Sequence, residues 1–173
     1  MHKKTYTKLI NAISSNKQTK ALVCLASKFI TGAIYVAYPA LLAWLLALGF
    51  TQNQAYFSTA LKAFSVPAIS FALTSILRNA INAQRPYEVL NIKPAINKET
   101  KGKSFPSRHT FSIFVIGVTF CACCPMPACG CVVLALGVCL AVLRVLAGVH
   151  FIKDVVAGAV LGVTCGIIGF WVL

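Results

Sequence analysis

The segment Arg144-Val-Leu-Ala-Gly-Val-His150-Phe-Ile-Lys-Asp154 lies between two apolar segments that are each long enough to cross a membrane. Ionisable side chains at a bilayer boundary are costly, about 2.5 to 3.5 kcal/mol each at the centre of a helix, so they need an explanation. His150 and Asp154 are four residues apart, which on a helix lets the carboxylate hold one imidazole nitrogen and leaves the other to attack or to take a proton. Arg144 can return over the same spot and bind an anion. The alternative is that these side chains only extend to the membrane surface.

The composition is that of an integral membrane protein of one domain's length. Of the 173 residues, 58% are hydrophobic and 11% are charged. The net charge of +13 comes mainly from residues outside the apolar segments, which favours anionic lipids and anionic substrates as partners and argues against nucleic acid. The first residues carry lysines and no apolar core, so we expect no cleavable signal peptide. We expect an integral protein of the bacterial cell membrane.

The hydrophobic pattern predicts an all-α integral membrane helical bundle. Residues 1–20 place Tyr6, Leu9, Ile10 and Ile13 at helical spacing among lysines, which predicts a basic amphipathic arm on the membrane surface. Residues 21–173 form the predicted transmembrane domain. It has about five transmembrane helices, at residues 29–50, 55–83, 107–124, 127–146 and 154–173. The glycines at 158, 162 and 166 recur every four residues, which favours close packing of the last helix inside the bundle.

Five of the eight cysteines surround a turn at Pro125-Met-Pro127: Cys121, Cys123, Cys124, Cys129 and Cys131. Such a cluster could ligate zinc, but no histidine or carboxylate is near it in the sequence and its neighbours are apolar. We therefore interpret these cysteines as small packing residues and predict no metal site. A disulfide across the turn stays open if the turn faces an oxidising compartment.

Three polar segments interrupt the apolar pattern. The first runs from Arg78 to Arg85-Pro86; these arginines are seven residues apart, two helical turns, so both can face one way. The second is Phe105-Pro-Ser-Arg-His109, where a helix is expected to begin with Ser107 as its N-cap, an arrangement that binds anions. The third is the segment from Arg144 to Asp154. The predicted helices bring all three to one membrane face, which indicates a phosphate site with a nucleophile and an acid.

These residues resemble the signature of the type 2 phosphatidic acid phosphatase superfamily. That signature reads Lys-x6-Arg-Pro, Pro-Ser-Gly-His and Ser-Arg-x5-His-x3-Asp. In this sequence the three parts read Arg78-x6-Arg85-Pro86, Pro106-Ser-Arg-His109 and Leu143-Arg144-x5-His150-x3-Asp154. Order and internal spacing match throughout, and the resemblance covers most of the chain.

The resemblance implies a metal-independent lipid phosphate phosphatase with a phosphohistidine intermediate and no cofactor. In this scheme His150 is the nucleophile, Asp154 orients it and His109 is the general acid. The phosphoryl oxygens would be held by Arg78, Arg85, Ser107, Arg108 and Arg144. The physical interpretation agrees, because arginine side chains can stabilise the negative charge of a transferring phosphoryl group.

Three residues depart from the superfamily pattern. Arg78 replaces a lysine, which keeps the charge and changes its geometry from a point to a fork. Arg108 replaces a glycine and adds a charge that can reach a diphosphate or narrow the entrance. Leu143 replaces a serine and removes one hydrogen-bonding group. We expect activity with an altered substrate preference.

We therefore expect hydrolysis of a phosphate monoester or diphosphate of a lipid. Candidate substrates are phosphatidic acid, phosphatidylglycerol phosphate and a polyprenyl phosphate or diphosphate, and membrane lipids are the other expected partners. The alternatives are a non-catalytic lipid-phosphate binding or transport protein, and an enzyme like the vanadium haloperoxidases, which resemble the same motifs. The lysines of the N-terminal arm favour a cytoplasmic site.

Overall fold

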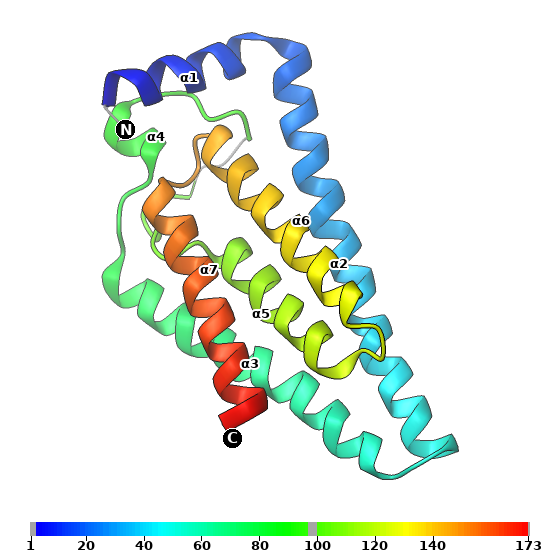
Figure 1. Ribbon diagram of the computed structural model, residues 1–173. Helices are drawn as coiled ribbons and strands as arrows, with labels where there is room; N and C mark the ends of the chain where they lie inside the picture. Colours follow the sequence, from blue (N-terminus) through cyan, green and yellow to red (C-terminus); the bar gives the residue numbers. More distant parts are fainter. Residues whose placement is uncertain (1–2, 97–99, 173) are drawn as a thin grey trace.

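The computed structural model describes residues 3–96 and 100–172, which form helices and loops and no strand (Figure 1). The helices are α1 (Lys3–Ser15), α2 (Lys17–Thr51), α3 (Ala55–Ile81), α4 (Pro86–Leu90), α5 (Arg108–Cys123), α6 (Pro127–Leu146) and α7 (Ile152–Ile167). A π-helical turn, Ile168–Val172, continues α7. The predicted all-α membrane bundle is confirmed.

Four of the five expected spans are long and apolar enough to cross a membrane: α2, α3 continued through α4, α6, and α7 with its final turn. Helix α5 has 16 residues and is shorter. At 1.5 Å per residue it covers roughly 24 Å of a hydrocarbon layer of about 30 Å. It packs against α3, α6 and α7 (Figure 1), so much of its surface contacts protein. The first turn of α5 carries a polar segment. It lies nearer the middle of the bundle than the neighbouring ends of α2 and α6 do (Figure 1).

The predicted helix limits are correct at some ends and wrong at others. Helix α6 covers the predicted residues 127–146. Helix α2 begins at Lys17, well before the predicted residue 29, because the Asn16 side chain accepts hydrogen bonds from the N–H groups of Gln18 and Thr19 and starts a helix there. Residues 17–28 therefore belong to the same helix as the first span, whereas the earlier part of the basic segment forms α1. The predicted division into domains at residue 20 stays a prediction.

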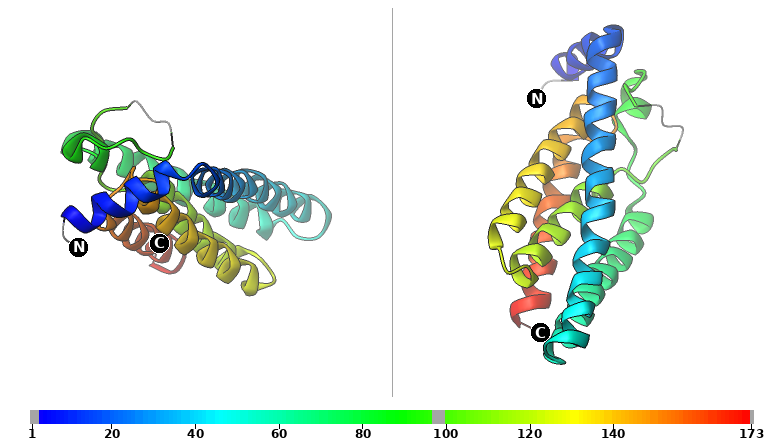
Figure 2. Two further views of the ribbon diagram at one scale, coloured as in Figure 1. Left: turned by 90° about the horizontal axis from the view of Figure 1, so that it is seen from above. Right: turned by 90° about the vertical axis from the view of Figure 1, so that its right-hand side faces the viewer.

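Helix α1 lies across one end of the bundle (Figures 1 and 2), as the prediction of a surface helix requires. Its apolar side chains Tyr6, Ile10 and Ile13 are buried against the protein, whereas the Leu9 side chain lies outside the described part. Ile13 belongs to a small second core with Val23, Ala95, Ala147 and Val149. The apolar face of α1 therefore contacts loops of its own chain.

Helix α7 packs directly on α5 through its glycines. A Cβ atom on Gly158 would lie 2.7 Å from the carbonyl oxygen of Ser107, and one on Gly162 would lie 2.6 Å from that of Phe111. Both distances are too short for a side chain. The contact brings the start of α5 against the start of α7, where the Ser107 N–H donates to the Asp154 carbonyl at 2.9 Å.

The turns at 52–54 and 124–126 and the end of α7 lie at the opposite end of the bundle from α1 (Figures 1 and 2). The cysteine-rich turn is at this distant end, and its thiols, like those of the other cysteines, are unbridged. Within residues 3–96 and 100–172, no group of three or more His, Cys, Asp or Glu side chains could hold a metal ion.

Candidate active site

The predicted pair of His150 and Asp154 is present and almost fully buried. His150 is 1% exposed and Asp154 is 0% exposed, and His150 Nδ1 lies 3.6 Å from Asp154 Oδ2. The two residues do not share a helix, because Gly148 turns the chain with φ +74° and α7 begins only at Ile152. Asp154 lies in the first turn of α7, and its Oδ2 accepts from the Phe151 N–H at 3.0 Å. This hydrogen bond turns the carboxylate back toward His150.

Ser104 completes this pair, and sequence reasoning missed it. The Ser104 hydroxyl donates to Asp154 Oδ2 at 2.5 Å and lies 3.4 Å from His150 Nδ1. The Ser104 side chain is fully buried, and its N–H donates to the Ala83 carbonyl at 2.8 Å. The only signal in the sequence is its place two residues before Pro106, because no spacing rule connects a loop serine with a carboxylate 50 residues later.

The two arginines of the first polar segment do not share a helix. Helix α3 ends at Ile81, because Asn82 adopts a left-handed conformation with φ 43°, and Arg85 lies beyond it at the start of α4. Arg78, in the last turn of α3, is buried, and its Nη1 donates to the Pro106 carbonyl at 3.4 Å. The predicted common orientation from two helical turns is therefore wrong, although both side chains reach the same end of the bundle.

Arg85 is bound by the loops around it. Its Nε donates to Gly102 O at 2.9 Å, its Nη1 to Val149 O at 3.1 Å and its Nη2 to Lys103 O at 3.2 Å. A guanidinium has five N–H donors, so these bonds leave two for an anion. Glu88, also missed in the sequence, fixes this loop: its carboxylate accepts from the N–H groups of Arg85 at 2.7 Å and Gly102 at 2.9 Å.

Arg144 is a buried arginine with an unsatisfied hydrogen-bond donor. It lies in the last turn of α6, is 7% exposed, and its Nε is buried without a hydrogen-bond partner among the described residues. Arg85 is close enough to repel it, and Arg78 is within electrostatic range of both Arg85 and Arg108. Buried like charges and an unpaired buried donor are costly unless a negative group joins them.

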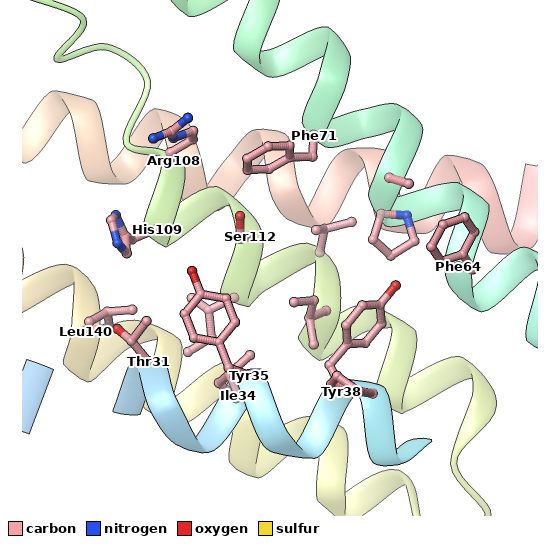
Figure 3. Close-up of a pocket in the computed structure, with 16 residues that line it drawn as sticks. Thr31, Ile34, Tyr35, Tyr38, Phe64, Phe71, Arg108, His109, Ser112 and Leu140 are labelled. Carbon is pink, nitrogen blue, oxygen red and sulfur yellow. The ribbon is translucent and has the colours of Figure 1, made fainter. Parts of the chain in front are cut away.

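Arg108 and His109 lie in the first turn of α5, at the polar end of a groove of about 480 Å³ (Figure 3). Arg108 is exposed, and its guanidinium lies 5.8 Å from the centre of the Phe71 ring. The rest of the groove is mainly apolar. Its other lining residues include Thr31, Ile34, Tyr35, Tyr38, Phe64, Pro67, Ser112 and Leu140.

The motif and the geometry agree with a comparison to known families. A sequence model of the PAP2 superfamily matches residues 59–173, which include all three polar segments. The chain belongs to the PAP2 superfamily. This confirms the family expected from the motifs, and it supports the expected class of activity, a membrane lipid phosphatase.

Two solved structures share the PAP2 fold seen here. The chain is similar to the crystal structure of Aquifex aeolicus LpxE, with 22% identity, a TM-score of 0.67, and coverage of 94% of this chain and 92% of that one. It is also similar to the transmembrane PAP2 type phosphatidylglycerolphosphate phosphatase from Bacillus subtilis, with 16% identity, a TM-score of 0.66, and coverage of 96% and 83%. At these identities the likeness concerns the fold. No curated protein matches the chain.

Ser107 stands at the N-cap position of α5, as predicted, but its side chain makes no capping hydrogen bond. The Ser107 hydroxyl instead accepts from the Thr110 hydroxyl at 3.1 Å. The predicted side-chain cap is therefore wrong. Because no side chain of Ser107 caps α5, the backbone N–H groups of its first turn can bind an anion, as those of other helices do.

The structure joins several of the predicted PAP2 residues through direct contacts. His150, Asp154 and Ser107 meet where α5 and α7 begin, and Arg85 donates to the peptide group that precedes His150. His109 and Arg108 line the groove, whereas the other predicted site residues lie outside its lining. Leu143, which replaces the serine of the PAP2 signature, packs against both hydrophobic cores.

Proposed function

We propose that this PAP2 protein hydrolyses a phosphate monoester or diphosphate of a lipid through a phosphohistidine intermediate on His150. The observation that carries the proposal is the buried pair of His150 and Asp154 at the end of the bundle that also holds buried arginines. One of these, Arg85, donates to the peptide group before His150, and another, Arg144, has an Nε without a partner in the described part of the chain. Candidate substrates are phosphatidic acid, phosphatidylglycerol phosphate and polyprenyl phosphates or diphosphates.

Asp154 selects which nitrogen of His150 reacts. The carboxylate faces Nδ1, so Nε2 is the nitrogen that attacks phosphorus. As the N–P bond forms, the imidazole becomes positively charged, and the carboxylate stabilises that charge. Ser104 and the Phe151 N–H donate to the same carboxylate oxygen and hold it in place. Burial strengthens these interactions by excluding water.

The arginines bind the phosphoryl oxygens. Arg85 has two N–H donors beyond those that bind loop carbonyls, and Arg144 has a buried Nε to satisfy. Arg78 adds a third buried positive charge. Negative charge on the equatorial oxygens of the transferring group is stabilised by such preorganised donors.

His109 supplies and recovers the proton. In the first step the bond from phosphorus to the lipid oxygen breaks, and the protonated His109 donates its proton to that oxygen. In the second step water attacks phosphorus, His109 takes a proton from the water and the N–P bond breaks. The products are the dephosphorylated lipid and phosphate. The position of His109 at the polar end of the groove supports its assignment to the leaving group.

The groove is suited to hold the hydrocarbon chain of the substrate. It is mainly apolar between α2, α3 and α5, and its polar end carries Arg108 and His109 (Figure 3). A lipid whose chain occupied the groove would have its head group beside Arg108 and His109. In this proposal Arg108, an exposed cation at the polar end of the groove, binds the second phosphate of a diphosphate.

Phosphate release from a panel of purified lipid phosphates tests the proposal. The purified protein in detergent, with EDTA and no added metal, should release phosphate from at least one lipid. His150→Ala should abolish release. Wild-type protein incubated with lipid labelled at phosphorus should carry an acid-labile, base-stable label that His150→Ala lacks. Binding of lipid without release would support the non-catalytic alternative, and turnover that EDTA removes would contradict the metal-independent scheme.

A further inference from the structure

Helix α1 reaches the active-site loop through Tyr6. The Tyr6 hydroxyl donates to the carbonyl oxygen of His150 at 3.0 Å and also lies 3.3 Å from that of Val145. The ring stacks on Phe151, with 5.9 Å between centroids, and the side chain is 5% exposed. Burial raises the pKa of the Tyr6 hydroxyl above its ordinary value, and the charge of Asp154 adds to this, so the hydroxyl stays protonated and remains a donor.

The backbone around His150 is held from three sides. The peptide group before it accepts a hydrogen bond from Arg85, and the peptide group after it donates to Asp154. The carbonyl of His150 itself accepts from Tyr6. Two of these three partners belong to the proposed catalytic machinery, and Tyr6 comes from a helix that the sequence assigns only to the membrane surface.

The rest of α1 packs on the same loop. Ile10 is fully buried, and its side chain occupies the space left by Gly148, where a Cβ atom would lie 3.1 Å away. Ile13 shares the second core with Ala147 and Val149 of this loop. A helix that only rested on lipid would turn these apolar side chains toward the bilayer. The contact between α1 and the loop is therefore a built interface.

We propose that α1 is a positioning element for the phosphatase reaction and that Tyr6 sets the position of His150 through its carbonyl group. The inference rests on the proposed role of His150 as nucleophile. Tyr6 is a positioning residue, because its hydroxyl binds the backbone and acts only through His150. The substrate phosphate is held by the arginines, so loss of the Tyr6 hydroxyl should affect attack on phosphorus more than binding.

Tyr6→Phe tests this inference because it keeps the ring and removes only the hydroxyl. Loss of one neutral hydrogen bond that supports the reacting geometry should lower kcat roughly 2- to 12-fold and leave KM within about twofold. Inhibition by vanadate, which adopts the trigonal bipyramidal geometry of a phosphoryl group under attack, should weaken by a similar factor. A merely structural role would reduce the amount of folded protein and leave the inhibition constant unchanged.

Hydrogen exchange gives a second measurement that needs no turnover. Amide exchange over residues 145–152 should be faster in Tyr6→Phe than in the wild type. Two control variants should match the wild type in kcat, vanadate inhibition and exchange. Tyr56→Phe removes a tyrosine hydroxyl from the start of α3, and Lys8→Ala changes an exposed side chain of α1 itself.

The outcomes separate the two proposals. An active wild type whose kinetics and exchange are unchanged by Tyr6→Phe overturns the positioning role alone. A wild type that hydrolyses none of the lipid phosphates overturns the proposed function and this inference together. An equal loss in Lys8→Ala would attribute the effect to contact of α1 with lipid and would also overturn the role of Tyr6.

Discussion

Replacing Ser104 with alanine removes one hydrogen bond from the buried carboxylate of Asp154. The hydroxyl donates to Oδ2 at 2.5 Å, and the same oxygen accepts from the Phe151 N–H at 3.0 Å and lies 3.6 Å from His150 Nδ1. A hydrogen bond to a charged group contributes about 1.5 to 3 kcal/mol. Because about 1.36 kcal/mol corresponds to a factor of ten, kcat should fall roughly 10- to 150-fold if the fixed carboxylate stabilises the transition state.

Steady-state phosphate release in detergent micelles measures this effect. KM should change little, because Ser104 contacts His150 and Asp154 and belongs to no arginine contact with the phosphate. Ser75→Ala is the matched control, since the Ser75 Oγ is buried and has no hydrogen-bond partner within the described ranges. It should keep kcat within about twofold of the wild type. If Ser104→Ala retains full kcat, or if both variants lose activity equally, the bond from Ser104 to Asp154 does not support catalysis.

Two further variants test how the site is held. Arg85→Lys should lower both the melting temperature and kcat, because a lysine cannot replace all three hydrogen bonds to Gly102, Lys103 and Val149. Each buried carbonyl left unpaired costs about 1 to 3 kcal/mol. Equal melting temperatures for Arg85→Lys and for Arg108→Lys, which changes an exposed arginine, would contradict this expectation. Gly158→Ala should destabilise the protein by about 1 to 3 kcal/mol, because its Cβ would lie 2.7 Å from the Ser107 carbonyl. Gly32→Ala is the control, since a Cβ atom on Gly32 has no heavy atom within 4 Å. Equal melting temperatures of the two alanine variants would show that α5 and α7 are not packed this closely.

Most of the bundle could be predicted from local patterns. An apolar segment between polar turns specifies its own ends, so α6 was predicted at its observed limits. The motif residues were placed at one end of the bundle because the direction of each helix follows from the direction of the one before. The details at helix ends were harder, since the left-handed Asn82 ends α3 before Arg85 and Gly148 turns the chain before His150. Each conformation depends on packing that spacing alone does not encode.

The missed residues act across long stretches of chain. Ser104 binds Asp154, Glu88 binds the backbone of Gly102, and Tyr6 binds the carbonyl of His150. A serine in a loop, a glutamate near a basic loop and a tyrosine in an amphipathic helix are each ordinary in sequence. Their roles come from tertiary contacts, whereas the arginine and histidine motifs carry their chemistry in residue type and spacing.

The contact between Tyr6 and His150 joins residues separated by 144 positions, nearly the full length of the chain. Along the chain, α1 comes before helices α2 to α6, and His150 comes after them. A partly synthesised chain that ends with α6 contains Val145, the second acceptor near the Tyr6 hydroxyl, and lacks His150. The proposed nucleophile therefore meets its hydrogen-bond partner on α1 only after α6 has been made.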